Sequence, residues 1–182
     1  MGVGGRATLP CRDGGPRLAL MTAQANKETI ERLYAAFADL NGAAMTACYA
    51  KGAHFRDPAF GDLEGDDIGA MWRMLTGRAR DLEITLREHD ADDATGTAHW
   101  LARYTFSTGR RVENDIQARF AFDDAGLITD HVDDFDFRRW ASQALGPKGH
   151  LVALLPPLRK KARAQALAQL TSYKREETGS SI

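Results

Sequence analysis

The chain has 182 residues, of which 43% are hydrophobic and 27% are charged, as is typical of a globular protein. A formal net charge of −1 gives no overall field that would attract nucleic acid, and no apolar segment reaches the length of a transmembrane helix. The two cysteines, Cys11 and Cys48, have neither metal-ligand nor redox spacing, so nothing indicates an oxidising compartment. We therefore expect a cytoplasmic protein without a nucleic-acid partner.

The first 24 residues are rich in Gly, Pro and Arg and show no periodicity. Their only apolar run, residues 18–21, is shorter than the apolar region of a signal peptide. The composition predicts a disordered leader over residues 1–24, and the alternative is that translation starts at Met21.

Helical periodicity follows this leader. Five apolar residues recur at three- and four-residue spacings and predict a first helix: Ile30, Leu33, Tyr34, Phe37 and Leu40. Asn26 is the expected N-cap of this helix, and Gly42 is its expected end. A short second helix is predicted from four residues that share a face: Ala44, Met45, Cys48 and Tyr49.

An extended segment and a third helix come next. The segment "AHFRDPAF" ends at Pro58, because proline cannot donate to a ladder and disfavours helix before it. Asp66 is the expected N-cap of the third helix, whose apolar stripe is Ile68, Met71, Trp72 and Leu75.

After residue 80 the apolar period changes to two, which predicts strands over residues 82–88, 97–106, 112–122 and 128–137. The turns "STGR" and "DDAG" place Gly where positive φ is needed. The third strand is expected to turn one face inward: Val112, Asn114, Ile116, Ala118, Phe120 and Phe122. Helices followed by an antiparallel meander predict an α+β domain with one sheet face packed on the helices.

Three stretches carry a resemblance to a known superfamily. "IERLYAAFADLNG" is similar to its first helix, "HFRDPAF" to its short strand ending in Asp-Pro, and "FAFDDAGLITDHVDDFDF" to its last hairpin. Over about residues 26–145 the chain resembles the nuclear transport factor 2-like superfamily, especially its SnoaL-like branch. The resemblance implies a cone-shaped fold with a deep, mostly apolar pocket. That domain would span residues 25–145, and a helical extension with a disordered end would span residues 146–182.

In the ketosteroid isomerases of this superfamily, the carboxylate of an Asp-Pro like Asp57-Pro58 is the general base, and a tyrosine and an aspartic acid form the oxyanion hole. Aligned by these motifs, the two oxyanion positions fall on Leu33 and Ala118, which cannot donate. Tyr34 is one residue away and is expected to point about 100° away around the helix. Ketosteroid isomerisation is therefore poorly supported.

The stretch "ITDHVDDFDF" is similar to the last strand of limonene epoxide hydrolases, whose acid–base aspartate falls on Asp133. Strand parity turns Asp133, His131 and Phe135 to one face, whereas Asp130, Asp134 and Asp136 share the solvated face. Ile128 and Val132 have the opposite parity, although apolar residues are also expected to face inward. A bulge in the strand would shift the alternation and allow both groups of residues to face inward. The hydrolases hold their aspartate with an Arg and a second Asp. The matching segment here, "AHWLAR", offers His99 and Leu101, so that triad is not reproduced.

We expect Asp57, Asp133 and His131 to be the catalytic acid–base residues. Six residues are expected to line the substrate pocket: Asn114, Trp100, Tyr104, Phe120, Phe135 and Trp72. Each has a structural alternative: Asp57 as an Asx cap, His131 as a half-buried sheet residue, and the aromatic residues as ordinary core. No metal site or cofactor motif is recognised.

Three functions remain open from the sequence. The first is a SnoaL-like small-molecule enzyme for isomerisation, cyclisation, hydration or dehydration of a hydrophobic substrate. The second is a non-catalytic carrier of a hydrophobic metabolite or lipid, and the third is a dimeric scaffold. We expect a homodimer through the outer sheet face, which carries Thr97, His99, Arg103, Thr105, Asp115, Gln117 and Arg119.

A helix is predicted over about residues 157–173 of the extension, and its first turns are basic: Arg159, Lys160, Lys161 and Arg163. Basic residues at a helix start oppose the macrodipole, so another interaction is expected to offset that cost. A solvated face is the simpler interpretation, and contact with a membrane surface or an anionic partner is the alternative.

Overall fold

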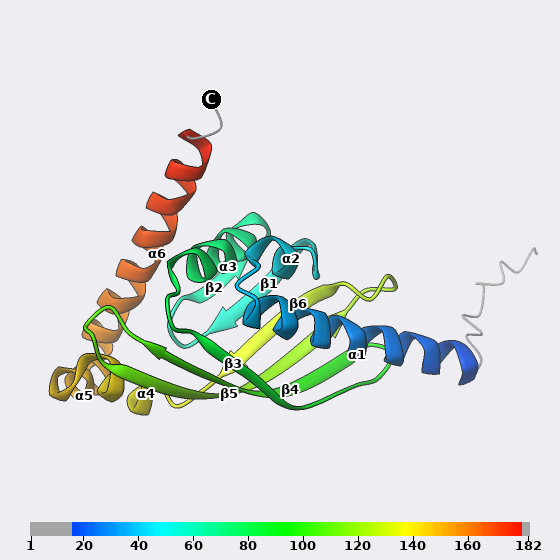
Figure 1. The fold of residues 1–182 in the computed structure, drawn as a ribbon, viewed down its shortest axis with the longest axis horizontal. Coiled ribbons are helices and arrows are strands. Elements are labelled where there is room, and N and C mark those ends of the chain that lie inside the picture. The colour runs from blue at the N-terminus through cyan, green and yellow to red at the C-terminus, as the bar shows by residue number, and fades with distance from the viewer. Residues whose placement is uncertain (1–15, 180–182) are drawn as a thin grey trace, which may run out of the picture.

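The computed structural model describes residues 16–179 and shows a curved sheet with helices on its concave face (Figure 1). The helices are α1 (Pro16–Ala38), α2 (Gly42–Thr46), α3 (Asp66–Arg78), α4 (Phe137–Leu145), α5 (Pro147–Leu154) and α6 (Pro156–Gly179). The strands are β1 (Tyr49–Asp57), β2 (Gly61–Glu64), β3 (Glu83–Ala91), β4 (Thr95–Thr105), β5 (Arg111–Phe122) and β6 (Ile128–Asp134). The predicted α+β architecture is confirmed.

The six strands form one sheet in the order β2-β1-β6-β5-β4-β3. All neighbours are antiparallel except β1 and β6, which run parallel because β6 returns to the middle of the sheet after the β3–β5 meander. The predicted turns after β4 and β5 are present, and Gly109 and Gly126 have φ of 79° and 74° there. This order places β6 at the centre, where side chains on its concave face are covered.

The core lies between the concave face and α1, α2 and α3. Four of the five residues of the predicted first-helix stripe are buried, and the fifth, Leu40, is 37% exposed beyond the end of α1. The four are buried with residues of α3 and of the concave sheet face: Ile30, Leu33, Tyr34, Phe37, Trp72, Trp100, Ala118, Phe120 and Ile128. On β5 the burial alternates as predicted, so Val112, Ile116 and Ala118 are buried while Gln117 and Arg119 are exposed. The period-two pattern thus identifies the face on which a pocket can form.

A bulge in β6 fixes which of its side chains face inward. Ala121 of β5 pairs with Asp130, but Phe122 pairs with Ile128, so Thr129 is the extra residue. Ile128 and His131 are therefore both buried although they are three residues apart. The bulge and the parity predicted from the sequence are both confirmed.

The start and end of the first helix differ from the prediction. The helix begins at Pro16, and Asn26 is a buried residue inside it whose Nδ2 donates to the carbonyl of Asp92 at 2.9 Å. Residues 16–24 of the predicted leader thus form the first turns of α1, and the rest of that leader lies outside the described residues. Asn26 is therefore not the N-cap that was predicted. Its side chain binds the distant carbonyl of Asp92 and not a backbone amide at the start of the helix.

The connection to the second helix also corrects the prediction. Gly42 is the first residue of α2 rather than the end of α1, and Asn41 caps α2 by accepting from the amide of Ala44. Leu40 makes the turn with φ of 54°, which is rare for a residue other than glycine. Tyr49 was predicted on the second helix but begins β1.

The N-cap of α3 is Gly65, and Asp66 is its first helical residue. Asp66 therefore places a carboxylate in the first turn, where it complements the helix dipole, instead of capping the helix.

The C-terminal third holds three helices where one was predicted. β6 ends at Asp134, and Asp136 caps α4 by accepting from the amides of Arg138 and Arg139, so residues 135–137 do not continue the strand. Helix α6 extends beyond the predicted range and packs on the domain through Leu170 and an Arg73–Glu177 ion pair of 2.8 Å. None of the described helices is long and apolar enough to cross a membrane.

Candidate active site

A histidine–aspartate pair lies on the concave side of β6. His131 and Asp133 are two residues apart, so the pleat turns both side chains to the same side, and they expose only 1% and 5% of their surface. His131 Nε2 lies 3.0 Å from Asp133 Oδ1. The bulge at Thr129 sets this orientation, because it shifts the alternation after the buried Ile128. Both acid–base candidates on this strand therefore face the interior.

The pair is the middle of a hydrogen-bond chain that has a tryptophan at each end. Trp72 Nε1 donates to the Tyr49 hydroxyl at 3.1 Å, and this hydroxyl lies 2.7 Å from His131 Nδ1. At the other end, Trp100 Nε1 donates to Asp133 Oδ1 at 3.4 Å. An indole only donates, so the Tyr49 hydroxyl accepts from Trp72, and its own proton goes to His131 Nδ1 when the imidazole proton is placed on Nε2. This assignment of the tautomer gives every donor of the chain an acceptor.

One oxygen of Asp133 accepts both of these bonds. Within residues 16–179, Oδ1 accepts from His131 and Trp100, and Oδ2 has no hydrogen-bond partner. Oδ2 is not among the fully buried side-chain atoms that lack a partner, so the remaining exposure of Asp133, 5%, leaves this oxygen accessible. Oδ2 is therefore the atom of this pair that is available to a bound molecule.

Asp57 is half-buried at the end of β1, before the turn into β2. Its Oδ1 accepts from the amides of Ala59 and Phe60, so it does form the Asx cap that was the structural alternative. Burial raises the pKa of this carboxyl to about 6, the amide of Phe60 holds it down, and the negative charge of Asp133 raises it further. The effect of Asp133 indicates that both carboxylates belong to the same interior region.

Tyr34 brings an unpaired hydroxyl to the same region. Its side chain is 3% exposed, its ring centroid lies 5.3 Å from that of Trp100, and its hydroxyl has no partner among the described residues. Burial, followed by the charge of Asp133, raises the pKa of Tyr34 well above its usual value, so the phenol stays protonated. Tyr34 was predicted to point about 100° away from Leu33, and both residues are buried, because the apolar stripe of α1 is wide enough to cover both directions.

Aromatic rings enclose the imidazole. The ring centroids of Phe120, Phe55 and Tyr49 lie 4.4, 5.1 and 6.0 Å from that of His131. Trp72, Trp100 and Phe120 are buried in the core, in agreement with the structural alternative for aromatic residues. The interior around the pair is thus largely apolar, which strengthens the electrostatic effect of any charge placed in it.

Three further site candidates are half-buried. Asn114 lies on the inward face of β5 opposite Ala102, and Tyr104 and Phe135 lie nearer to α4. The Tyr104 hydroxyl accepts from Trp140 Nε1 of α4 at 2.8 Å, and the ring centroid of Phe135 lies 6.3 Å from that of Trp140. Burial raises the pKa of Tyr104, the hydrogen bond from Trp140 lowers it, and the charge of Asp57 raises it, so Asp57 belongs to this side of the interior.

Tyr49 and Trp140 were not predicted as residues of the site. Tyr49 was assigned to a helix, and its pairing with Ile128 of β6 depends on a parallel contact that no local pattern reveals. Trp140 lies on α4, which was not predicted although a signal was available. Asp136 is a potential N-cap, and the apolar residues after it follow a helical period: Phe137, Trp140, Ala141, Ala144 and Leu145.

The positions aligned with relatives agree with the doubts raised by the sequence. Leu33 and Ala118 are buried, so the two oxyanion donors of ketosteroid isomerases have no counterpart there. His99 points to the outer face, where its Nε2 lies 2.8 Å from Asp115 Oδ1. Asp133 is instead held by His131 and Trp100, which the hydrolase pattern does not contain.

No group of three or more His, Cys, Asp or Glu side chains that could hold a metal ion occurs in the described part of the chain. Two surface hollows, of about 760 and 450 Å³, lie beside α6. Neither is lined by Asp57, His131 or Asp133.

Comparisons with known proteins agree with the fold. Residues 30–131 match the model of the SnoaL-like domain. An epoxide hydrolase of M. tuberculosis similar to limonene epoxide hydrolase has 19% identity and a TM-score of 0.58, covering 74% of this chain and 98% of that one. The pinacolase BvnE of Penicillium brevicompactum has 16% identity and a TM-score of 0.57, covering 65% and 87%.

A protein of Catenulispora acidiphila with a ketosteroid isomerase-like fold has 15% identity and a TM-score of 0.58, covering 66% of this chain and 94% of that one. No curated protein matches the chain. These likenesses show a shared fold.

Proposed function

The chain belongs to the SnoaL-like domain family, and from this premise we propose that it is an enzyme that performs acid–base chemistry on a small hydrophobic molecule inside the cone. Asp133 is the proton acceptor, Tyr34 is a hydrogen-bond donor to a substrate oxygen, and Asp57 is the second acid–base group. His131 and Trp100 hold Asp133, and Tyr49 orients His131.

The observation that carries this proposal is the buried carboxylate of Asp133, of which one oxygen is held by two donors while the other has none. A purely structural aspartate in an apolar core normally has both oxygens hydrogen-bonded, since each unmade bond costs stability. The unpaired hydroxyl of Tyr34 lies in the field of the same carboxylate. A free acceptor and a free donor within one apolar interior are what a polar substrate group requires.

The proposed reaction needs a proton removed at one atom and charge stabilised at another. Asp133 Oδ2 accepts a proton from a carbon next to a carbonyl, or from a hydroxyl or water, and the Tyr34 hydroxyl donates to the oxygen on which charge develops. His131 is a positioning residue, because its Nε2–H fixes Asp133 Oδ1 and its Nδ1 is held by Tyr49. Asp57, with a pKa of about 6, changes protonation near neutral pH and therefore suits either giving or taking the second proton.

The apolar surroundings favour a hydrophobic substrate that carries an oxygen. Apolar rings surround His131, the Tyr34 hydroxyl is buried without a partner among the described residues, and Asp133 Oδ2 accepts no hydrogen bond from them. The half-buried Asp57, Tyr104 and Phe135 form the proposed entrance. Some proteins that share the fold are named an epoxide hydrolase and a pinacolase, and both names describe acid–base chemistry at an oxygen-bearing carbon.

The test compares Asp133→Asn with Asp134→Asn, a matched change on the same strand at an exposed position. Both variants and the wild type are incubated in D₂O with a terpene-sized epoxide, a β,γ-unsaturated ketone and a tertiary alcohol, and products are followed by mass spectrometry. We expect turnover of at least one probe. Asp133→Asn should lower kcat at least about hundredfold, while its affinity for the probe stays within about tenfold of the wild-type affinity. Asp134→Asn should leave both kcat and affinity unchanged.

Equal turnover by wild type and Asp133→Asn would contradict the proposal. If no probe is converted but one binds and quenches tryptophan fluorescence, the carrier function is favoured, because Trp72 and Trp100 both lie in the hydrogen-bond chain.

A further inference from the structure

The charge of the chain is distributed unevenly. Residues 137–175 contain nine Lys and Arg residues and no Asp or Glu, although the whole chain has a net charge of −1. Four of these cations cluster around the junction of α5 and α6: Lys148, Arg159, Lys160 and Lys161, all of which are exposed. Arg159–Lys161 lie in the first turns of α6, where positive charge opposes the helix dipole. An anionic partner would offset that cost.

Exposed leucines occupy the same junction. Of the exposed large hydrophobic residues in the described part of the chain, four of five lie here: Leu151, Leu154, Leu155 and Leu158, each 36–57% exposed. We call residues 148–161 the α5–α6 elbow. From Leu154 to Lys161 every residue is exposed; Leu155 separates the two helices, and Pro156 and Pro157 begin α6. Apolar side chains in an unbroken exposed run are costly to leave in water, which indicates that they have a partner.

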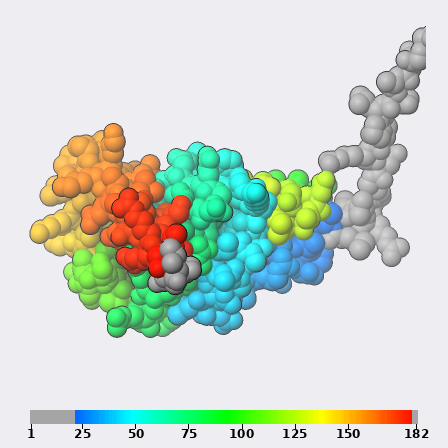
Figure 2. All heavy atoms as spheres, turned by 90° about the horizontal axis from the view of Figure 1, so that it is seen from above, coloured from blue at the N-terminus to red at the C-terminus, as the bar shows by residue number. Residues whose placement is uncertain are grey.

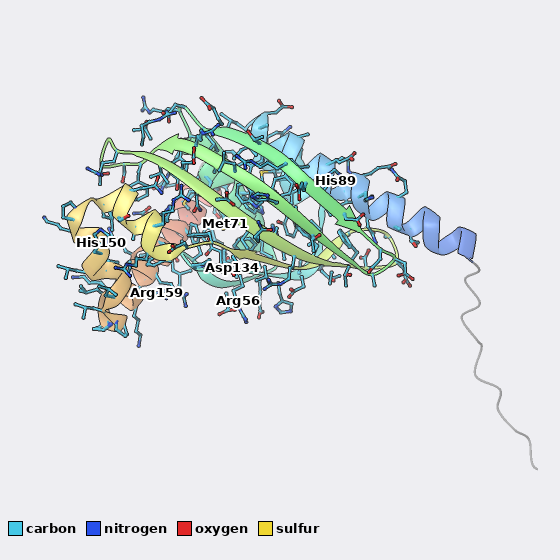
Figure 3. The ribbon with its side chains drawn as sticks, turned by 90° about the horizontal axis from the view of Figure 1, so that it is seen from below. Arg56, Met71, His89, Asp134, His150 and Arg159 are labelled. Carbon is cyan, nitrogen blue, oxygen red and sulfur yellow. The ribbon has the colours of Figure 1, made fainter. Side chains whose placement is uncertain are left out.

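The elbow forms one end of the molecule. Figure 2 shows it in yellow to orange at the end opposite α1, and Figure 3 places the labelled His150 and Arg159 there. Only Arg159 is engaged with the domain, since its guanidinium lies 4.7 Å from the ring centroid of Phe137. Lys148, Lys160 and Lys161 form no ion pair with the residues that the structure describes. The leucines and the lysines are therefore presented together on a projecting tip.

A second copy of the chain is a less suitable partner for this tip. A stable dimer buries about 800 Å² on each partner, and four partly exposed leucines offer a patch of a few hundred Å². A projecting apolar tip surrounded by lysines matches the arrangement by which peripheral proteins dock on anionic membranes. The apolar side chains enter the headgroup boundary and the cations remain near the phosphates.

We propose that the α5–α6 elbow docks on the surface of anionic lipid membranes, with Leu151, Leu154, Leu155 and Leu158 in the interface and Lys148, Lys160 and Lys161 on the lipid headgroups. Two weak contributions act together, because neither a few leucines nor a few lysines alone gives stable attachment. This inference is independent of the proposed enzyme activity, since no residue of the elbow belongs to the candidate active site.

The test is sedimentation of the full chain with vesicles of phosphatidylcholine alone or with about one third phosphatidylserine. We expect binding to the anionic vesicles, and weakening when salt is raised from about 0.05 to 0.5 M. Lys160→Glu with Lys161→Glu should reduce the partition coefficient at least tenfold, and so should Leu154→Ser with Leu155→Ser. Circular dichroism verifies that these exposed changes leave the fold intact.

The matched control is Lys51→Glu with Arg87→Glu, which changes net charge equally at exposed positions outside the elbow. It should change the partition coefficient less than twofold. Four results would overturn the proposal, and three of them concern vesicle binding: equal binding to both kinds of vesicle, equal effects of the lysine pair and the control, or no effect of the leucine pair. A dimer that light scattering detects in the wild type and that only the leucine pair abolishes would overturn it in favour of a second copy.

Discussion

Two histidine–aspartate pairs lie on opposite faces of the same sheet. His131 and Asp133 of β6 are 3.0 Å apart on the concave face, and their side chains are 1% and 5% exposed. His99 of β4 and Asp115 of β5 are 2.8 Å apart on the outer face, and their side chains are 23% and 43% exposed. Both pairs join a histidine Nε2 to an aspartate Oδ1 at nearly the same distance, so the two pairs differ mainly in burial.

This difference in burial is the reason that we propose a function for the inner pair and none for the outer pair. His99 and Asp115 are partly exposed to water, so their attraction contributes little to stability. Around the inner pair, protein atoms supply the hydrogen-bond partners, and the tautomer assigned to His131 turns its unprotonated Nδ1 to the Tyr49 hydroxyl. Asp133 Oδ2 accepts no hydrogen bond from the described residues and is the atom left to a ligand.

The largest expected difference is in stability. His131→Ala should lower the free energy of unfolding by about 3–5 kcal/mol, because it leaves Asp133 buried with one donor and the Tyr49 hydroxyl without an acceptor. His99→Ala should lower it by less than about 1 kcal/mol. Urea unfolding of both variants measures the difference. Equal losses would show that burial does not separate the pairs.

A second prediction compares two buried tyrosines of the inner face. Tyr49→Phe should cost about 1–3 kcal/mol, because Trp72 Nε1 and His131 Nδ1 each lose their partner. Tyr34→Phe should leave stability unchanged or slightly higher, since its hydroxyl has no partner to lose among the described residues. If Tyr34 binds substrate, the same variant lowers kcat. Unfolding curves and the probe assay together test this, and a stable Tyr34→Phe protein with full activity would remove Tyr34 from the site.

Much of the inner face was predictable because it depends on local pattern. The alternation of β5 and the parity of β6 identified His131 and Asp133 as inward residues, and the conflict of Ile128 with that parity indicated the bulge. Tyr49 and Trp140 were not predictable in this way. Tyr49 reaches His131 through a parallel pairing of distant segments. Trp140 lies on α4, whose apolar residues do follow a helical period, but its contact with Tyr104 joins residues 36 positions apart and has no local signal.

The third prediction concerns pH. The folded-state pKa of Asp57 is raised to about 6, above its unfolded value of about 3.9, so the folded chain holds this proton more tightly. Its contribution to stability is present below pH 4 and is lost as pH rises to about 6, a change on the order of 1–2 kcal/mol after allowance for its partial exposure. Asp57→Asn should remove this dependence, and its unfolding free energy between pH 4 and 6.5 should be flatter. If the unfolding free energy of the wild type and of Asp57→Asn depends on pH with the same slope, the raised pKa of Asp57 is contradicted.

The smallest expected effect concerns the outer face and the predicted homodimer. In a single chain, a double-mutant cycle of His99→Ala and Asp115→Ala should give a coupling energy below about 1 kcal/mol, because the pair is exposed. Arg103 and Glu113 are also paired on this face, 2.9 Å apart, so it presents little unpaired charge to a second copy. Such a face tolerates a two-fold contact without strong repulsion.

A homodimer through this face would bury the outer pair and make it more like the inner one. The coupling energy should then increase with protein concentration, and light scattering at micromolar concentration should give twice the 20.0 kDa mass of the chain. Arg119→Glu on this exposed face should lower the dimer fraction, because it replaces a cation that can pair with Asp115 of the second copy by an anion that repels it. A mass of 20.0 kDa at every concentration, with a constant coupling energy, would rule out the dimer. In that case the difference in burial between the inner and the outer pair is a property of the single chain alone.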